Sequence, residues 1–339
     1  MTQQRGPVRL SEVAHRAGVS VATASKALNE RGQVAPETRR RVRQAADELG
    51  FRPNALARGL LSGRSRTVGL LTDELGGRFA IPILLGVEDA LADGQMSVLL
   101  CDARGDAIRR RHYIQTLLER RVDGIIVLGE SNDVRTSLSG DIPVPVVYAY
   151  AESSDPADLS VVSDDTGGAR LAATHLIDLG RRRIGHITGE ESYRAARDRA
   201  ASLRTVLDEA GLPMTGAPMY GDWSQRWGRH AARTLLAAHP ETDAIFCGSD
   251  QIAVGAADAL RDLGARVPDD VSLVGYDNWE IFATECRPPL TTIDLDLTHL
   301  GATAVRHLLA ALDGDTATGT LHCPCRLVVR ESTGPPPAG

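Results

Sequence analysis

Three short stretches near the N-terminus repeat apolar residues every three or four positions, which is the spacing of amphipathic helices. They cover residues 10–17, 21–28 and 37–49. Ser11 and Ser20 can cap the first two stretches, and Gly18 can take the positive φ that ends the first in a tight turn. The second stretch is short, and its apolar residues are mostly alanine. This order predicts a helix-turn-helix domain.

From Thr67 onward, short runs that are apolar throughout alternate with longer amphipathic stretches. The expected strands are 68–71, 97–101, 124–128, 144–149, 160–163, 184–188, 244–247 and 271–276. The expected helices include 83–92, 109–120, 167–179, 195–209 and 225–238. Apolar strands that alternate with helices predict an α/β core with parallel sheets covered on both faces, and two series of similar length predict two like lobes. A ligand would then lie beyond the carboxyl ends of the strands and between the lobes.

The net charge of −6 hides an uneven distribution. Residues 1–66 hold 13 basic and 5 acidic residues, a net charge of +8, so the remainder carries −14. A basic head suits a polyanion, whereas phosphates would repel the acidic body. A purely structural three-helix bundle is the alternative, but it does not explain a basic surface around a short helix so poor in large apolar residues. We therefore expect the head to bind DNA through the major groove.

The chain begins without the apolar stretch of a secretory signal, and no apolar run approaches the roughly 20 residues that span a bilayer. We expect a cytoplasmic protein without a membrane partner and with five reduced cysteines. His322, Cys323 and Cys325 could suggest a metal site. However, an extended Cys-x-Cys segment points both side chains to one strand face, and no second ligand pair is evident. We expect ordinary strand cysteines and no metal.

Common catalytic signatures are missing from the core. There is no Gly-x-Ser-x-Gly elbow, no Walker loop and no Gly-x-Gly-x-x-Gly at the first strand–helix turn. Asp164 and Asp165 could act as acid and base, but no partner is identifiable. We expect neither an enzyme nor a cofactor, with a sugar-processing α/β enzyme as the alternative.

Several segments, in the same order, resemble the lactose-repressor (LacI) family of bacterial regulators along nearly the whole chain. In the head they are residues 10–14, 17–23, 28–29, 34–39 and 50–54. In the core they are residues 121–127, 275–278, 288–293 and 328–333. Any one of these motifs alone is weak, but several in the right order over one chain are strong.

The resemblance implies a core built like a periplasmic sugar-binding protein, with two Rossmann-like lobes joined by three chain crossings. It also implies a homodimer on a pseudo-palindromic operator. The expected domains are a helix-turn-helix domain over 1–53, a hinge helix or linker over 54–66, an effector-binding and dimerisation core over 67–334 and a disordered tail over 335–339. In the core, we expect the N-lobe over about 67–162 and 294–320 and the C-lobe over about 163–293 and 321–334. The proline-rich end cannot form the leucine heptad that makes some relatives tetramers, so we expect a dimer.

The family pattern also implies which residues contact DNA. The residues that read bases from the second helix are Val21, Ala22 and Lys26. Lysine at the third of these positions stands where relatives usually carry arginine, and it can still donate to guanine. The residues that contact phosphates are Ser20, Thr23, Ser25 and Asn29. Leu60 matches the leucine that wedges into a minor-groove step, with Ala57 beside it.

In the cleft, the segment 221–224 resembles the one by which sugar-responsive relatives place an indole, here Trp223, against the apolar face of a sugar. Arg199 and Asp277 match the family's pair for vicinal hydroxyls. The other candidate ligand-binding residues are Arg78, Phe79, Asp102, Tyr150, Asp164, Ser249, Asp250 and Trp279. Tyr150 departs from the family, because relatives often carry aspartate there. The expected effector is a sugar or oligosaccharide, with a purine or another metabolite as the alternative, since nucleobases also stack on aromatic rings.

Overall fold

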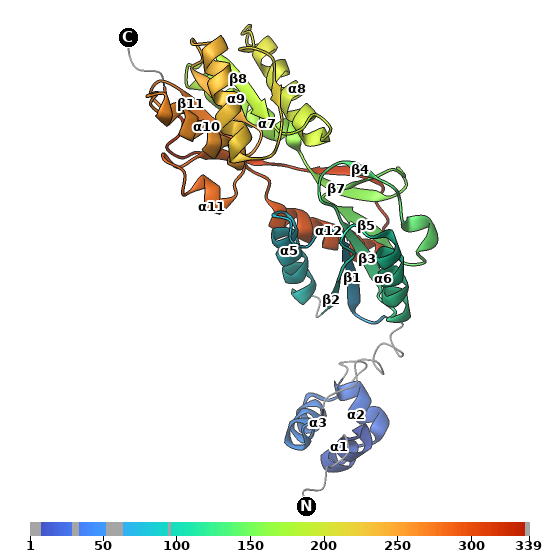
Figure 1. The fold of residues 1–339 in the computed structure, drawn as a ribbon. Coiled ribbons are helices and arrows are strands. Elements are labelled where there is room, and N and C mark those ends of the chain that lie inside the picture. The colour runs from blue at the N-terminus through green and yellow to red at the C-terminus, as the bar shows by residue number, and fades with distance from the viewer. Residues whose placement is uncertain (1–7, 29–33, 52–63, 94–95, 336–339) are drawn as a thin grey trace, which may run out of the picture. The chain divides into compact units, whose positions relative to one another are not determined.

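A computed structural model of the chain describes residues 8–28, 34–51, 64–93 and 96–335 (Figure 1). By its internal contacts the chain divides into two compact units. One is a helical head that ends at Thr67 and includes the segment 119–123, and the other is the α/β core. The expected hinge is described only from residue 64 on, and of the expected tail only Pro335 is described. No helix among the described residues is long and apolar enough to cross a membrane.

The head consists of the three predicted helices, drawn in blue in Figure 1. They are α1 (Leu10–Ala17), α2 (Val21–Leu28) and α3 (Pro36–Leu49). Their apolar faces meet in a small core in which Val13, Ala24 and Val42 are fully buried. Gly18 and Gly50 end α1 and α3 with φ of 64° and 65°, in the left-handed region that glycine adopts without a steric penalty.

The two predicted serine caps have different outcomes. Ser20 caps α2, because its Oγ accepts a hydrogen bond from the backbone N–H of Thr23 at 3.1 Å. The predicted cap at Ser11 is wrong, since α1 already begins at Leu10. The Glu12 carboxylate serves that end instead and accepts from the backbone N–H of Arg9 at 3.1 Å.

The N-lobe is built on a six-stranded sheet with the order β13-β7-β5-β3-β1-β2. The strands are β1 (Thr67–Thr72), β2 (Ser97–Asp102), β3 (Gly124–Leu128), β5 (Val146–Ala149), β7 (Leu159–Ser163) and β13 (Gly319–Cys323). The pairs from β13 to β1 are all parallel. The helices are α5 (Ala80–Asp93), α6 (Ala107–Glu119) and α12 (Leu297–Leu312), and a 3-10 turn, η1 (Ser139–Asp141), and a small sheet of β4 (Val134–Arg135) and β6 (Glu152–Ser153) complete the lobe.

Two glycines let α12 lie directly against α5, as the orange and teal helices of Figure 1 show. A Cβ atom on Gly301 would lie 2.2 Å from the carbonyl oxygen of Ile83. A Cβ atom on Gly86 would lie 2.0 Å from the carbonyl oxygen of Thr298. Through these contacts α12, from late in the chain, packs on α5, the first helix of the core.

The C-lobe is built on a second six-stranded sheet with the order β14-β12-β11-β10-β8-β9. The strands are β8 (Ile184–Thr188), β9 (Met219–Tyr220), β10 (Ala244–Cys247), β11 (Ser272–Asp277), β12 (Thr291–Asp294) and β14 (Arg326–Val328). The helices are α7 (Asp165–Asp178), α8 (Arg194–Glu209), α9 (Gln225–Ala238), α10 (Asp250–Asp262) and α11 (Glu280–Ala283). The pairs are parallel except for β14, which runs antiparallel to β12. The predicted fold class, two α/β lobes behind a helical head, is confirmed.

The predicted strands and helices of the core all form, with their ends shifted by at most three residues. The prediction that the sheets are covered on both faces is wrong at β2. This strand lies at the edge of its sheet, where Leu99 and Leu100 are 37% and 38% exposed.

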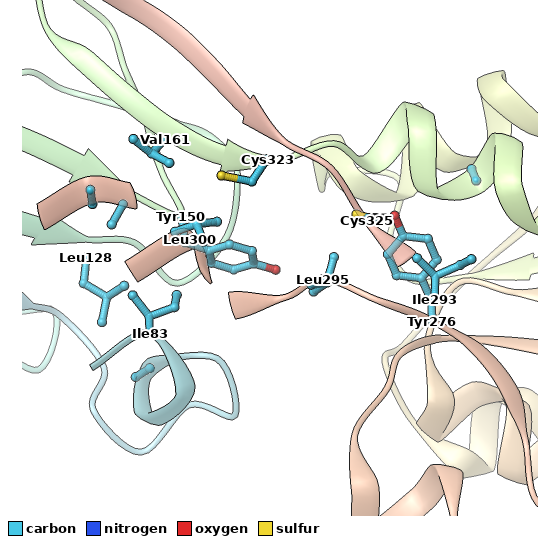
Figure 2. Packing of buried hydrophobic residues seen from close by; sticks show 14 of the residues in the cluster. Ile83, Leu128, Tyr150, Val161, Tyr276, Ile293, Leu295, Leu300, Cys323 and Cys325 are labelled. Atoms are coloured by element: carbon cyan, nitrogen blue, oxygen red, sulfur yellow. Dashed lines mark hydrogen bonds between the residues drawn. The ribbon is translucent and has the colours of Figure 1, made fainter. Parts of the chain in front are cut away.

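The chain crosses between the lobes three times, as predicted, after β7, after β12 and after β13. The third crossing follows Cys323, slightly later than the expected boundary at 320, because β13 still pairs with β7 of the N-lobe. The expectation that Cys323 and Cys325 share a strand face is therefore wrong, since the two thiols lie on either side of a crossing. Figure 2 shows Cys323 near Val161 and Cys325 next to Tyr276, whose hydroxyl lies 3.9 Å from the thiol. Among the described residues no group of three or more His, Cys, Asp or Glu is arranged to hold a metal ion.

The buried apolar cluster continues from one lobe into the other along these crossings. In Figure 2, Leu295 lies between Tyr150 and Leu300 on the N-lobe side and Ile293 and Tyr276 on the C-lobe side. The crossings are therefore packed segments.

Candidate functional site

Helix α2 turns its large and polar side chains outward. Ala24 and Ala27 are buried against α1 and α3, whereas Val21, Ala22 and Lys26 are exposed. Val21 is 48% exposed, which is high for a large apolar residue in a small domain. The three predicted base-reading side chains therefore share the outer face of one short helix, and that face is free to enter a groove.

The predicted phosphate-contacting residues are placed only in part. The hydroxyls of Ser20 and Thr23 lie 2.8 Å apart at the start of α2, where Ser20 also serves as the cap. Ser25 is half-buried in the middle of α2. Asn29, Ala57 and Leu60 lie outside the described residues.

The core contains a cavity of about 290 Å³ between its two lobes. It is lined by Glu74, Gly77, Arg78, Phe79, Ala80, Gly129, Glu130, Ser131, Asn132, Tyr150, Tyr193, Ala195, Arg199, Trp223, Gln251 and Trp279. Six of the predicted ligand-binding residues are among them: Arg78, Phe79, Tyr150, Arg199, Trp223 and Trp279. Five aromatic rings and four charged side chains thus face one small space.

The indole of Trp223 packs against Gly189, where the lack of a side chain leaves room for the ring. A Cβ atom on Gly189 would lie 2.0 Å from the Trp223 ring, so the indole packs directly on the backbone that follows β8. Tyr193 contacts the same indole edge-on, with 5.9 Å between the ring centroids. Ser224 then caps α9 by accepting from the backbone N–H of Trp227 at 3.1 Å. This local structure presents a fixed aromatic face to the cavity.

Arg199 is the centre of a buried polar network. Its Nε donates to Asp165 Oδ1 at 2.8 Å, and its Nη1 donates to the carbonyl oxygen of Gly248 at 2.5 Å. The guanidinium carbon lies 3.6 Å from the centroid of the Tyr276 ring, and Asn132 Nδ2 donates to Asp165 Oδ2 at 2.7 Å. Burial alone would lower the pKa of Arg199, but the Asp165 carboxylate and the other acidic groups around the guanidinium together outweigh burial and hold the pKa above its ordinary value. Arg199 therefore stays charged and fixed.

Asp250 and Asp277 lie just behind the wall of the cavity. Asp250 accepts from the backbone N–H of Trp279 at 2.7 Å and from the Thr292 hydroxyl at 2.6 Å. Burial, together with the nearby charge of Asp277, raises the pKa of Asp250 to about 8. Burial likewise raises the pKa of Asp277, even though Arg78 Nη2 lies 2.9 Å from its Oδ2.

The side chain of Asp277 has ion pairs but no aligned hydrogen bond. Within the described part of the chain neither of its carboxylate oxygens accepts one, although Arg78 and, at 4.0 Å, Arg199 lie close by. Its backbone has a φ of 104°, which is unusual for a residue with a side chain. The Oδ1 atom of Asn132, on the cavity wall, is also buried without a donor among the described residues. The site thus holds acceptors that a ligand rich in hydroxyl groups could satisfy.

Five predicted ligand-binding residues do not line the cavity: Asp250 and Asp277, which lie behind its wall, and Asp102, Asp164 and Ser249. Asp164 caps α7 by accepting from the backbone N–H of Gly167 at 2.8 Å. Ser249 is fully buried and caps α10 through the backbone N–H of Ile252. Asp102 lies at an adjoining acidic hollow, which shares Glu74 and Glu130 with the cavity.

Some residues of the site carry little signal in the sequence. Asp165, next to the predicted Asp164, is the carboxylate that holds Arg199, and a strand end alone does not tell which of two adjacent aspartates turns inward. Asn132 and Tyr193 reach the site from loops without a motif. Gln251 directly follows the predicted Asp250, so its position could have been inferred from the same strand end.

Known families and structures match both parts of the chain. Residues 9–54 match the family model for bacterial regulatory proteins of the lacI family, and residues 173–333 match that for a periplasmic binding protein-like domain. The chain is 33% identical to the ribose operon repressor of Halalkalibacterium halodurans over 96% of each chain. It is 32% identical to catabolite control protein A of Priestia megaterium, over 96% of this chain and 99% of the relative. It is also 31% identical to the repressor PurR of Photobacterium profundum, over 88% and 90%.

Two solved structures have the same architecture. The lac repressor dimer bound to operator and the anti-inducer ONPF aligns with a TM-score of 0.76 and 29% identity, over 97% of this chain and all of that one. A complex of the transcriptional regulator CelR with cellobiose aligns with a TM-score of 0.64 and 31% identity, over 96% and 99%.

Proposed function

The chain belongs to the LacI family of bacterial regulatory proteins, and from that premise we propose that it is a repressor whose affinity for its operator is set by a sugar in the cavity between the lobes. It is a DNA-binding transcriptional regulator that responds to a small molecule, and it is not an enzyme. The operator would be pseudo-palindromic, because a two-fold symmetric dimer presents two copies of α2.

DNA recognition is assigned to the outer face of α2 and to the hinge. Val21 and Ala22 offer methyl groups to thymine, and Lys26 offers a donor to guanine. Leu60 and Ala57 of the hinge are proposed to enter the minor groove, while Ser20, Thr23, Ser25 and Asn29 contact phosphates. In this scheme residues 1–53 form the reading head, residues 54–66 the hinge and residues 67–334 the sensing core. We place the protein in the cytoplasm, on the nucleoid.

The observation that carries the sugar assignment is that Trp223 and Arg199 lie next to each other on the wall of one small cavity. The indole supplies a flat apolar face, and the network around Arg199 supplies fixed polar groups. Sugars have faces rich in C–H bonds and rims rich in hydroxyls, so they need both kinds of group. Relatives named for ribose and for a cellobiose complex support this class. The effector would act by binding one lobe orientation more tightly than the other.

A purine effector is the alternative, because some relatives are repressors named PurR. Thermal-shift measurements on the full chain with mono- and disaccharides and with purine bases separate the two classes. We expect at least one sugar to raise the Tm of the wild type but not that of Trp223→Ala, with Arg226→Ala, an exposed C-lobe variant, behaving as the wild type. Stabilisation by purine bases alone would overturn the sugar assignment.

A further inference from the structure

Arg78 is an N-lobe side chain that reaches into the C-lobe at the cavity. It lies between β1 and α5, yet its polar contacts are with the other lobe. Its Nη2 lies 2.9 Å from Asp277 Oδ2, and its Nη1 donates to Gln251 Oε1 at 3.2 Å. One side chain thus links the loop before α5 to the end of β11 and the start of α10.

The guanidinium of Arg78 also lies against two aromatic rings. Its central carbon is 4.5 Å from the centroid of the Phe79 ring and 5.5 Å from that of the Trp279 ring. Two ring faces, a carboxylate and an amide oxygen are the groups that recognise a planar cation. We name Phe79, Trp279, Asp277 and Gln251 the guanidinium site.

We propose that the guanidinium site is a cation-binding site filled by the chain's own Arg78, which latches the two lobes together and which an effector reaching Asp277 must open. This inference deepens the proposed function and rests on it, because Asp277 is also the residue assigned to the hydroxyls of the effector. Arg78 and the effector would then compete for one carboxylate.

The two arginines of the cavity differ in how firmly they are held. Arg199 is 3% exposed and is fixed by Asp165, by the Gly248 carbonyl and by the face of Tyr276. Arg78 is 16% exposed, and its close approach to Asp277 includes no aligned hydrogen bond. In a charge pair of poor geometry, the attraction between the charges offsets less of the desolvation penalty than it does in a buried, well-aligned pair. Arg78 is therefore the guanidinium that can leave.

The contact between Arg78 and Asp277 limits which effectors can bind. Any ligand that donates to Asp277 while Arg78 stays in place must share a carboxylate already neutralised by a cation. A ligand with hydroxyl donors can replace Arg78 at Asp277, whereas an anionic group would be brought against Glu74 and Glu130, which line the same cavity. These two glutamates thus disfavour phosphorylated ligands.

Chemical rescue tests the latch without operator or effector. In the full chain, Arg78→Ala removes the guanidinium and leaves its site intact. Methylguanidinium chloride at ~20 mM, far below denaturing concentrations, should therefore raise the Tm of this variant above its value in an equal concentration of NaCl. Wild type and Arg226→Ala should show no such difference. The double variant Arg78→Ala, Asp277→Asn should also show none, since the carboxylate that attracts the cation is gone.

A folded Arg78→Ala protein whose Tm responds to methylguanidinium no more than the wild type does would overturn the latch. If Arg78→Ala does not fold, Arg78→Gln takes its place in the same comparison, because glutamine keeps a hydrogen-bond donor and is short enough to leave the guanidinium position open. Small-angle scattering provides a second readout, because loss of the latch should enlarge the radius of gyration and methylguanidinium should reverse the change. Since none of these measurements involves DNA, failure of the latch would leave the proposed function standing.

Discussion

At the scale of single residues, the C-lobe core contains a titratable group that has no part in binding. His186 is fully buried, its ring stacks on Phe246 at 4.8 Å between centroids, and its Nδ1 lies 2.8 Å from the carbonyl oxygen of Phe246. Its Nε2 has no partner among the described residues. Burial lowers the pKa of His186 to about 4, so the folded protein keeps this ring neutral.

This histidine predicts an acid-sensitive fold. The unfolded chain binds a proton at the ordinary pKa of 6.5, whereas the folded chain binds it only near 4. The contribution of His186 to the free energy of unfolding is therefore complete above pH 6.5 and falls by about 3 kcal/mol as the pH drops toward 4. Urea unfolding between pH 7 and pH 4 measures the slope, which His186→Phe should flatten and the exposed-site control His230→Gln should not. An unchanged slope in His186→Phe would contradict the assignment.

Gly189 predicts a second effect at this scale. Alanine there would place a Cβ atom 2.0 Å from the Trp223 ring, so the indole must move off the cavity wall. We expect Gly189→Ala to lose about 1–3 kcal/mol of stability through overpacking and to change the tryptophan fluorescence. Gly140→Ala is the matched control, because its new methyl group meets nothing within 4 Å. Equal effects in the two variants would show that Gly189 does not position the indole.

At the scale of elements, the sequence predicts what is local and misses what is not. The helices of the head and the strand–helix alternation of the core follow from apolar spacing, which each segment carries by itself. The partner of a strand depends on distant segments. For this reason the pattern did not show that residues 319–323 pair with β7, or that Cys323 and Cys325 belong to different lobes. The same limit applies to the site, where the contacts among Arg199, Asp165 and Asn132 join three separate segments of the chain.

Helix α2 carries the prediction that belongs to this scale. Lys26 lies on its exposed face, and Lys26→Ala removes a donor without disturbing the buried alanines. We expect operator affinity to fall by about 1–3 kcal/mol, because a specific contact to a guanine is lost. Arg226→Ala, which removes one positive charge from the C-lobe, should bind as the wild type does. Fluorescence anisotropy with labelled operator measures both, and equal affinities for all three proteins would refute the role of Lys26.

At the scale of the whole molecule, large apolar side chains are exposed on two neighbouring elements of the N-lobe. Leu99 and Leu100 of the edge strand β2 and Ile81 and Leu85 of the neighbouring α5 are all more than a third exposed. Exposed apolar side chains that gather on adjacent elements indicate an interface. Because LacI-family regulators act as dimers, we assign this surface to a second copy of the chain.

Charges placed on that surface should separate the dimer. Leu99→Asp combined with Leu85→Asp puts two carboxylates into the assigned interface, where they would be desolvated without partners. We expect a monomer in sedimentation analysis, with operator affinity reduced at least tenfold because one head binds only one half-site. Ile108→Asp, on α6, is the control, since Ile108 is 83% exposed and should stay so in the dimer. A dimer that survives the double change would place the interface elsewhere.

The central claim is that a basic head binds a specific duplex and that a ligand between the lobes alters this binding. Titration of the purified chain onto its own promoter fragment tests this most directly, at two salt concentrations, with and without the sugar that raises its Tm. The account predicts preference over random DNA, affinity that falls steeply with salt, and a change of about 5–150-fold when the sugar is added. Equal affinity for promoter and random DNA, with no change when the sugar is added, would contradict the central claim.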